Sequence, residues 1–164
     1  MEWTYDKIAR WFGNYFEAVC KYQGSIDTVS NLKKYFSADL ELLMYTSPSS
    51  PPVVSMSRDA LLISFIHPGL QEDIVPQHLV IDTKKLIVAV QFTIHFMDKP
   101  TDKKWPDIQA SAHYHLTIDE NQDLKIAKIF YWTEKLPEDL FDIWGARREE
   151  ALKNCALQSI HSNS

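Results

Sequence analysis

The stretches LIVAVQFTIHFM (residues 86–97) and QASAHYHLTI (residues 109–118) decide the fold, because apolar and polar side chains alternate along both. Successive side chains of a β-strand point to opposite faces of the sheet, so the even-numbered residues form one apolar face. The opposite face carries the imidazole, amide and hydroxyl groups of Gln91, Thr93, His95, Gln109, Ser111, His113 and His115. Alternation alone leaves open which face is enclosed, and a sheet with its apolar face inward is the common pattern.

The segments on either side of these two stretches predict an α+β fold. Apolar residues recur every three or four positions in residues 5–22, which predicts a helix that ends at Gly24. The helical and strand patterns are segregated along the chain, which is typical of a mainly antiparallel sheet packed against helices. The other predicted elements are helices at 25–36, 57–66 and 138–156 and strands at 39–45, 77–81 and 124–133.

The composition is that of one globular domain. Of the 164 residues, 45% are hydrophobic and 24% are charged, so we assign residues 1–157 to a single domain and residues 158–164 to a flexible tail. The net charge of −5 and the lack of a basic stripe argue against a nucleic-acid partner. No apolar run could span a membrane and residues 1–6 do not resemble a signal peptide, so we expect a cytoplasmic protein.

The sequence predicts neither a cofactor nor a bound metal ion. It contains only 4 glycines and no glycine-rich phosphate loop or dinucleotide fingerprint. Cys20 and Cys155 lack the spacing of a metal or redox pair, and we expect both to be reduced. His113 and His115 are two residues apart, but no third zinc ligand accompanies them in a recognisable motif.

Short stretches of the chain carry a resemblance to a known family. These stretches are Tyr22 at the end of the first helix, Gln77-His78 before an apolar strand, His95 late in the next strand, Gln109 and Ser111 in the strand that follows, and Phe141–Trp144. Together with the order of elements over almost the whole chain, they resemble the scytalone dehydratase and SnoaL-like branches of the nuclear transport factor 2-like (NTF2-like) superfamily. The chain departs from the family at Gln23, where the family has aspartate, and at Met44, where it has a second catalytic tyrosine.

The resemblance implies a cone-shaped fold in which a curved sheet and N-terminal helices enclose a pocket. It also implies that the odd-numbered face of the two alternating strands is the inner one. His78, His95 and Tyr22 would then be the catalytic residues, with His78 taking or delivering the proton. The substrate-binding residues would be Trp11, Tyr15, Tyr45, Gln91, Thr93, Gln109, Ser111, His113, Ile129, Tyr131 and Trp144.

The same orientation predicts that the protein is a homo-oligomer. If the odd-numbered face is inside, the even-numbered face forms a large exposed apolar patch, which a monomer rarely tolerates. The residues of that expected patch are Phe92, Ile94, Phe96, Tyr114, Leu116, Phe130 and Trp132. We therefore expect a dimer or a trimer that assembles through the convex face of the sheet.

These expectations describe a cofactor-free lyase or isomerase of secondary metabolism. Its substrate would be an apolar, oxygenated small molecule of polyketide or terpenoid type, and its reaction a dehydration, double-bond isomerisation or cyclisation. A histidine suits this chemistry because it can accept or donate a proton near neutral pH. Two alternatives stay open: a non-catalytic module of the same fold that binds a hydrophobic ligand or a protein, and the reverse sheet orientation with solvent-exposed histidines.

Overall fold

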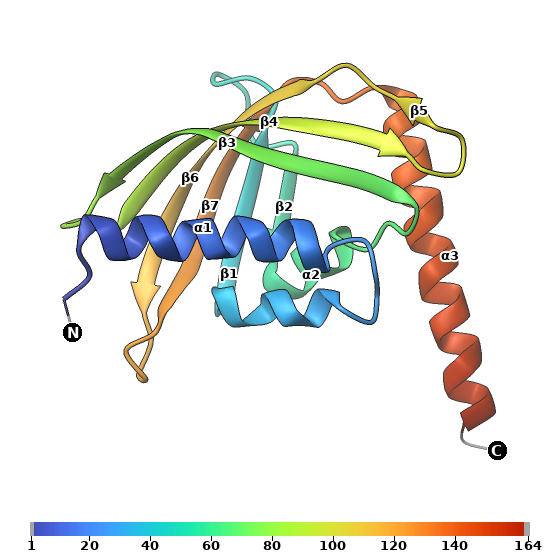
Figure 1. Cartoon of the computed structure of the whole chain (residues 1–164), viewed down its shortest axis with the longest axis horizontal. Coiled ribbons are helices and arrows are strands. Elements are labelled where there is room, and N and C mark those ends of the chain that lie inside the picture. Colours follow the sequence, from blue (N-terminus) through green and yellow to red (C-terminus); the bar gives the residue numbers. More distant parts are fainter. Residues whose placement is uncertain (1, 163–164) are drawn as a thin grey trace.

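The computed structural model describes the backbone of residues 2–162 and the side chains of residues 2–156. It is an α+β structure in which helices lie on the concave side and at one end of a curved sheet (Figure 1). The helical elements are α1 (Tyr5–Tyr22), the 3₁₀ helix η1 (Val29–Tyr35), α2 (Arg58–Ser64) and α3 (Glu138–Ser162). No helix among the described residues is both long and apolar enough to cross a membrane.

The sheet has seven strands, and all neighbouring pairs but one are antiparallel. Its strands are β1 (Phe36–Tyr45), β2 (Val54–Ser57), β3 (Leu70–Asp82), β4 (Ile87–Asp98), β5 (Lys103–Lys104), β6 (Ile108–Ile118) and β7 (Leu124–Thr133). They are ordered β2-β1-β7-β6-β4-β3, with β5 paired to β4, and β1 runs parallel to β7. The predicted fold class is thereby confirmed.

Helix α1 crosses the concave side of the sheet and forms the core with it (Figure 1). Its buried residues recur at helical spacing, as the sequence predicts. Aromatic rings make much of this contact: the Phe12 ring lies 5.1 Å from that of Tyr114, and the Phe16 ring lies 6.2 Å from that of Phe92. The sheet face that meets α1 must therefore be apolar.

The even-numbered residues of β4 and β6 face inward, so the expected orientation of these two strands is wrong. Val90 and Phe92 of β4 and Ala112 and Tyr114 of β6 are all less than 5% exposed. By contrast, Gln91 between the first two is exposed. The two strands alternate as the sequence predicts, but the apolar face is the enclosed one because α1 covers it.

A bulge explains why the odd-numbered Ile129 and Tyr131 of β7 nevertheless face inward, as predicted. Ile129 pairs with Tyr114 and Tyr131 pairs with Ala112, so the inward residues of this part of β7 are odd-numbered. The register shifts by one position between His115 and Leu116, where Leu116 pairs with Ile126. A one-residue shift moves every later side chain to the other face, so parity does not carry over from one strand to the next.

The large exposed apolar patch, from which the oligomer is predicted, is also wrong. Five of the seven residues expected in that patch are buried inside: Phe92, Ile94, Phe96, Tyr114 and Leu116. Phe130 and Trp132 do lie on the outer face, where their rings stack 6.3 Å apart. The homo-oligomer itself stays a prediction.

Several element boundaries differ from those the sequence predicts. The expected second helix, 25–36, is shortened to the 3₁₀ helix η1, and β1 begins at Phe36 rather than at residue 39. The strand expected at 77–81 extends back to Leu70 as β3, with a register shift between Pro76 and His78. Proline is tolerated there because β3 is the edge strand and the proline lies at an irregularity.

The C-terminal helix is longer than expected. Helix α3 continues to Ser162, six residues past the predicted end at residue 156. Of the tail expected at 158–164, residues 163–164 lie outside the described residues. The division into a domain at 1–157 and a tail stays a prediction.

Adjacent substitutions in β4 test the orientation of the sheet. Ile94→Ala should lower the free energy of unfolding by about 2–4 kcal/mol, because it removes a buried side chain. His95→Ala should change it by less than about 1 kcal/mol, because the exposed pair of His95 with Asp107 contributes little. Urea denaturation of both variants measures the difference. A larger loss for His95→Ala would contradict the observed orientation.

Candidate functional site

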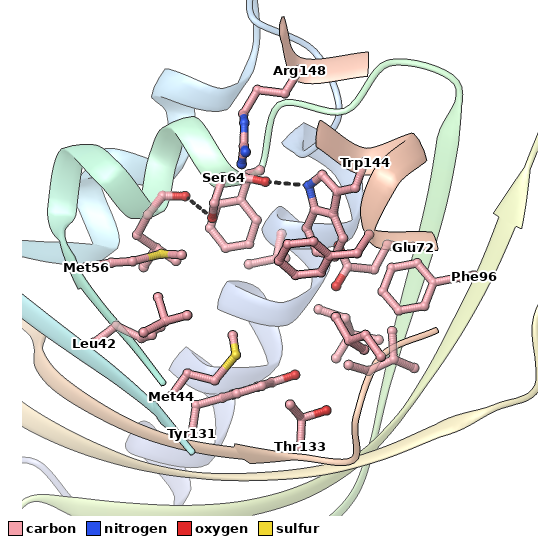
Figure 2. Close-up of a pocket in the computed structure, with 18 of the residues that line it drawn as sticks. Leu42, Met44, Met56, Ser64, Glu72, Phe96, Tyr131, Thr133, Trp144 and Arg148 are labelled. Carbon is pink, nitrogen blue, oxygen red and sulfur yellow. Dashed lines mark hydrogen bonds between the residues drawn. The ribbon is translucent and has the colours of Figure 1, made fainter. Parts of the chain in front are cut away.

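A cavity of about 540 Å³ lies between the concave face of the sheet and the helices. Its walls come from α1, α2, α3 and the strands β1 to β4, β6 and β7, and they are mainly apolar (Figure 2). The apolar lining includes Phe16, Val19, Leu42, Met44, Met56, Leu61, Phe65, Ile74, Phe92, Ile94, Phe96 and Ile129. A volume and lining of this kind suit a small apolar molecule.

Glu72 of β3 places a carboxylate in the wall of this cavity. Its side chain is 7% exposed, and Figure 2 shows it beside the rings of Trp144 and Phe96. A buried carboxylate is costly unless a charge or hydrogen-bond donor compensates it. The compensating group is His67, whose Nε2 lies 3.4 Å from Oε2 of Glu72 and whose side chain is 1% exposed.

The other contacts of His67 determine what this pair can do. Nδ1 lies 3.0 Å from the carbonyl oxygen of Leu70, and a carbonyl only accepts, so Nδ1 carries a hydrogen. Nε2 of His67 and Oε2 of Glu72 then face each other, each without a hydrogen-bond partner among the described residues. A single proton between them makes either an ion pair or a neutral acid–imidazole pair, so the two groups form a buried proton-holding dyad.

Three tyrosines line the same cavity: Tyr15, Tyr114 and Tyr131. Desolvation by burial raises the pKa of all three phenols. The negative charge of Glu72 raises the pKa of Tyr131 and Tyr15 further, so the carboxylate lies within electrostatic range of both. The three phenols stay protonated. Tyr15 and Tyr114 hydrogen-bond to each other, which uses one hydroxyl hydrogen of that pair and leaves the other to donate to an oxygen atom of a ligand.

Helix α3 closes one side of the cavity and is held by polar contacts. Nε1 of Trp144 donates to the carbonyl oxygen of Ser64 in α2 at 2.9 Å (Figure 2). Nearer the start of α3, Nε1 of the buried Trp105 donates to Asp139 at 3.1 Å. Trp105 is thus an anchor for α3. Phe141, in the first turn of the helix, lines the cavity although its side chain is 61% exposed, so α3 also forms the mouth.

Four of the residues predicted to bind substrate line the cavity. They are Tyr15 from α1, Ile129 and Tyr131 from β7, and Trp144 from α3. Their presence there agrees with the expected pocket between the sheet, the first helix and the last helix. No observation tests whether they bind a substrate, so that role stays a prediction.

The three residues predicted to be catalytic lie outside the cavity. His78 is exposed and pairs with Gln91, so its side chain shares the outer face of the sheet. The His95 side chain is 46% exposed, and its Nδ1 lies 2.6 Å from Asp107. Tyr22 and Trp11 pack against the core from α1 without lining the cavity. Catalysis by His78, His95 and Tyr22 stays untested, but the structure does not bring the three together.

The remaining predicted residues gather on the outer face instead. Gln91, Gln109, Ser111 and His113 line a shallow depression there, next to Trp132. Gln77 donates to Thr93, which donates to Gln109, so the polar groups satisfy one another. Tyr45 stacks on Trp132 beside them, with ring centres 5.5 Å apart. The sequence therefore identified a real cluster and assigned it to the wrong side of the sheet.

Sequence reasoning missed Glu72, His67 and Tyr114. Glu72 was overlooked because Pro76 made the strand seem to start at residue 77. The pattern Leu70-x-Glu72-x-Ile74 is an alternating one in which a carboxylate occupies an inward position, and it could have indicated a buried acid. Among the described residues, no three histidine, cysteine, aspartate or glutamate side chains come close enough to hold a metal ion.

Comparison with known proteins identifies the fold and goes no further. No protein-family model and no curated protein sequence matches the chain. Among solved structures, ActVI-ORFA from Streptomyces coelicolor superimposes with a TM-score of 0.59 at 9% identity, over 80% of this chain and 98% of its own. The β subunit of benzoate 1,2-dioxygenase from Burkholderia mallei gives 0.59 at 10% identity, over 82% and 93%.

An NTF-2-like protein of unknown function from Pseudomonas aeruginosa superimposes with a TM-score of 0.50 at 14% identity, over 78% of this chain and 98% of its own. The chain has the NTF2-like fold. This finding confirms the cone-shaped architecture that the sequence resemblance implies. Because one fold hosts many functions, the activity must be argued from the cavity of this NTF2-like chain.

The buried phenols predict a steep loss of stability at alkaline pH. Unfolded tyrosines ionise near pH 10, whereas the pKa values of Tyr15, Tyr114 and Tyr131 are raised in the folded state. Stability is therefore full below about pH 10 and falls above it, by about 1.4 kcal/mol per pH unit for each such phenol. Urea denaturation at pH 9, 10 and 11 measures the slope.

Single substitutions test whether the buried phenols cause the loss of stability at alkaline pH. Tyr114→Phe should make the alkaline slope shallower than in the wild type, because one buried phenol is removed. Tyr5→Phe, at a half-exposed position of α1, controls for the loss of a hydroxyl group. An identical slope in the wild type and in Tyr114→Phe would contradict the burial of this phenol.

Proposed function

We propose that the chain binds a mainly apolar, oxygen-bearing small molecule in the cavity and catalyses proton transfer on it. The observation that carries this proposal is the Glu72–His67 dyad in the wall of an otherwise apolar cavity. Reactions of this class include double-bond isomerisation, dehydration and cyclisation next to a carbonyl group. The proposal keeps the reaction class inferred from the sequence and moves the base from His78 to Glu72.

Glu72 is the group suited to act as the base. Its buried carboxylate lies in the cavity wall, where it can contact a bound ligand, and a carboxylate within reach of a C–H bond next to a carbonyl group can accept its proton. The apolar walls around it exclude water from the bound ligand. A C–H bond next to a ligand carbonyl could then transfer its proton to Glu72, while the bonding electrons move to the carbonyl oxygen.

The tyrosines can stabilise the negative charge that develops on the carbonyl oxygen. The developing negative charge on the carbonyl oxygen needs hydrogen-bond donors that are already in place. The raised pKa values of the phenols keep their protons attached, so Tyr131 and one hydroxyl of the Tyr15–Tyr114 pair can serve as such donors. Glu72 would therefore act as the base and the phenols as neutral hydrogen-bond donors, a pattern known for enolisation in apolar sites.

His67 supports Glu72 from behind the cavity wall. Its hydrogen bond to Leu70 fixes the ring, so Nε2 stays directed at Oε2 of Glu72. With the dyad's own proton on Nε2, His67 compensates the Glu72 carboxylate, and the ligand's proton is a second proton that the carboxylate takes up. The proton is thereby kept next to the ligand and can return to a different carbon, as an isomerisation requires.

A non-catalytic binding module is the second candidate function. The same apolar lining would hold a hydrophobic ligand without any reaction. The similarity of the fold to the β subunit of benzoate 1,2-dioxygenase shows that this architecture also occurs as one subunit of a larger enzyme. The two candidates differ in whether Glu72 is needed for a measurable chemical step.

Hydrogen–deuterium exchange into a panel of apolar ketones tests the base without knowledge of the true substrate. In D₂O the wild type should accelerate exchange at carbon atoms next to the carbonyl of the ketones it binds. Glu72→Gln should lower this rate by about 10²–10⁴-fold, because the amide cannot take the proton. Mass spectrometry of the recovered ketone measures the incorporation.

Two variants make this test decisive. Glu17→Gln is the matched control, since it makes the same substitution at an exposed position of α1 outside the cavity. His78→Ala tests the assignment made from the sequence. Exchange that persists in Glu72→Gln and disappears in His78→Ala would overturn the role of Glu72. Binding by the wild type without exchange of any ketone would favour the binding module.

The role of His67 has a signature of its own. His67→Gln should lower the exchange rate by about tenfold or more and move the midpoint of its pH profile, because the imidazole next to the Glu72 carboxylate is removed. The melting temperature of the variant, followed by circular dichroism, checks that it folds. A folded variant with a lower rate but an unmoved midpoint would reduce His67 to a purely structural residue.

A further inference from the structure

Arg148 is a half-buried cation at the mouth of the cavity. It lies on α3 and lines the cavity, and its side chain extends toward Ser64 of α2 (Figure 2). Among the described residues it has no ion-pair or hydrogen-bond partner, although a guanidinium group offers five N–H donors. Its nitrogen atoms are not among the buried polar atoms that lack a partner, so the guanidinium group reaches solvent at the mouth and is free to bind an anion there.

The neighbours of Arg148 on α3 are engaged elsewhere. Arg147 donates to Asp98 at 3.2 Å, and the Asp98 side chain is 2% exposed, so this arginine is structural. Glu149 pairs with Lys153 at 3.0 Å. Adjacent arginines therefore differ: one fixes the helix to the sheet, and the other is directed at the cavity.

We propose that Arg148 binds the carboxylate of an amphiphilic acid whose apolar body occupies the cavity. The inference rests on the proposed function and names the substrate class for it: a carboxylic acid with a carbonyl or hydroxyl group within its apolar part. The planar guanidinium matches a carboxylate with two parallel hydrogen bonds. The acidic side chains of Asp142 and Glu149 also line the mouth, so a singly charged carboxylate fits better than a doubly charged phosphate.

The charges of the site also fix the direction in which such a ligand enters. Glu72 lies in the enclosed wall, and two carboxylates in an apolar cavity repel each other strongly. The carboxylate of the ligand is therefore excluded from the interior and stays at the mouth, where Arg148 and solvent stabilise it. The apolar end then enters first and brings the oxygenated carbon toward Glu72 and the tyrosines.

Binding of a matched pair of ligands tests the proposal without any reaction. Decanoate and 1-decanol have the same chain length and differ in charge, and calorimetric titration measures the affinity of each. The wild type should prefer decanoate, and added salt should weaken decanoate binding more than decanol binding. Arg148→Gln should weaken decanoate binding roughly tenfold and leave decanol binding within about twofold. Arg148→Lys should restore part of the loss.

A matched control and a folding check accompany this experiment. Arg10→Gln removes one positive charge from an exposed position of α1 and should change neither affinity. The melting temperature of Arg148→Gln establishes that the variant is folded. Equal decanoate affinities of the wild type and Arg148→Gln would overturn the proposal, as would a wild type that binds decanol as tightly as decanoate or does not bind decanoate.

The outcomes separate this inference from the proposed function. If ketone exchange depends on Glu72 while Arg148→Gln leaves decanoate affinity unchanged, the proposed function stands and the substrate class is wrong. If decanoate binding depends on Arg148 while Glu72→Gln keeps full exchange activity, Arg148 does bind the carboxylate and Glu72 is not the base.

Discussion

The packing of α1 against the concave face of the sheet determines which side of every strand is enclosed. The rings of Phe12 and Phe16 contact those of Tyr114 and Phe92, so apolar residues of β4 and β6 must point toward the helix. Burial of apolar surface is the dominant favourable term in protein folding, and this contact removes large aromatic rings from water. The polar residues of the same strands are consequently placed on the outer face, where they bond to one another or to solvent.

The same packing leaves room for a site at one end. Ile8 and Phe12 in the first half of α1 are less than 2% exposed and belong to a filled core. Toward the end of the helix, Tyr15, Phe16 and Val19 line the cavity instead. Strand β3 and helix α3 close this end with Glu72 and Trp144, which come from segments far apart in the sequence. The site is thus the part of the cone that the core does not fill.

The sequence predicted the elements better than it predicted their orientation. Periodicity identified α1, β4, β6 and β7, because each has an alternating or helical apolar pattern of its own. Ser57 was recognised as the start of α2, and its hydroxyl does accept a hydrogen bond from the backbone of Ala60. The inward face of β4 and β6 depends on contact with α1, and the inward residues of β7 depend on the register shift next to His115. Neither is encoded within a single strand.

The candidate site was predictable only in part for the same reason. Tyr15, Ile129, Tyr131 and Trp144 were placed correctly, since the resemblance to NTF2-like proteins locates the walls of the cone. The resemblance also implies catalytic histidines in the strands, whereas the buried acid–base pair consists of Glu72 and a histidine from the loop before β3. That pairing joins residues five positions apart, and it arises from the turn between His67 and Leu70 rather than from a motif.

The Glu72–His67 dyad has a cost in stability that argues for a function. Removing two ionisable groups from water is expensive, and their mutual attraction across 3.4 Å rarely compensates fully. Replacing a buried ion pair by apolar residues of similar volume is often neutral or stabilising. Sites that break the rules of core composition are expected where chemistry requires them. A dyad that opens onto a cavity large enough for a ligand meets that description, whereas a purely structural pair would gain nothing from facing an open space.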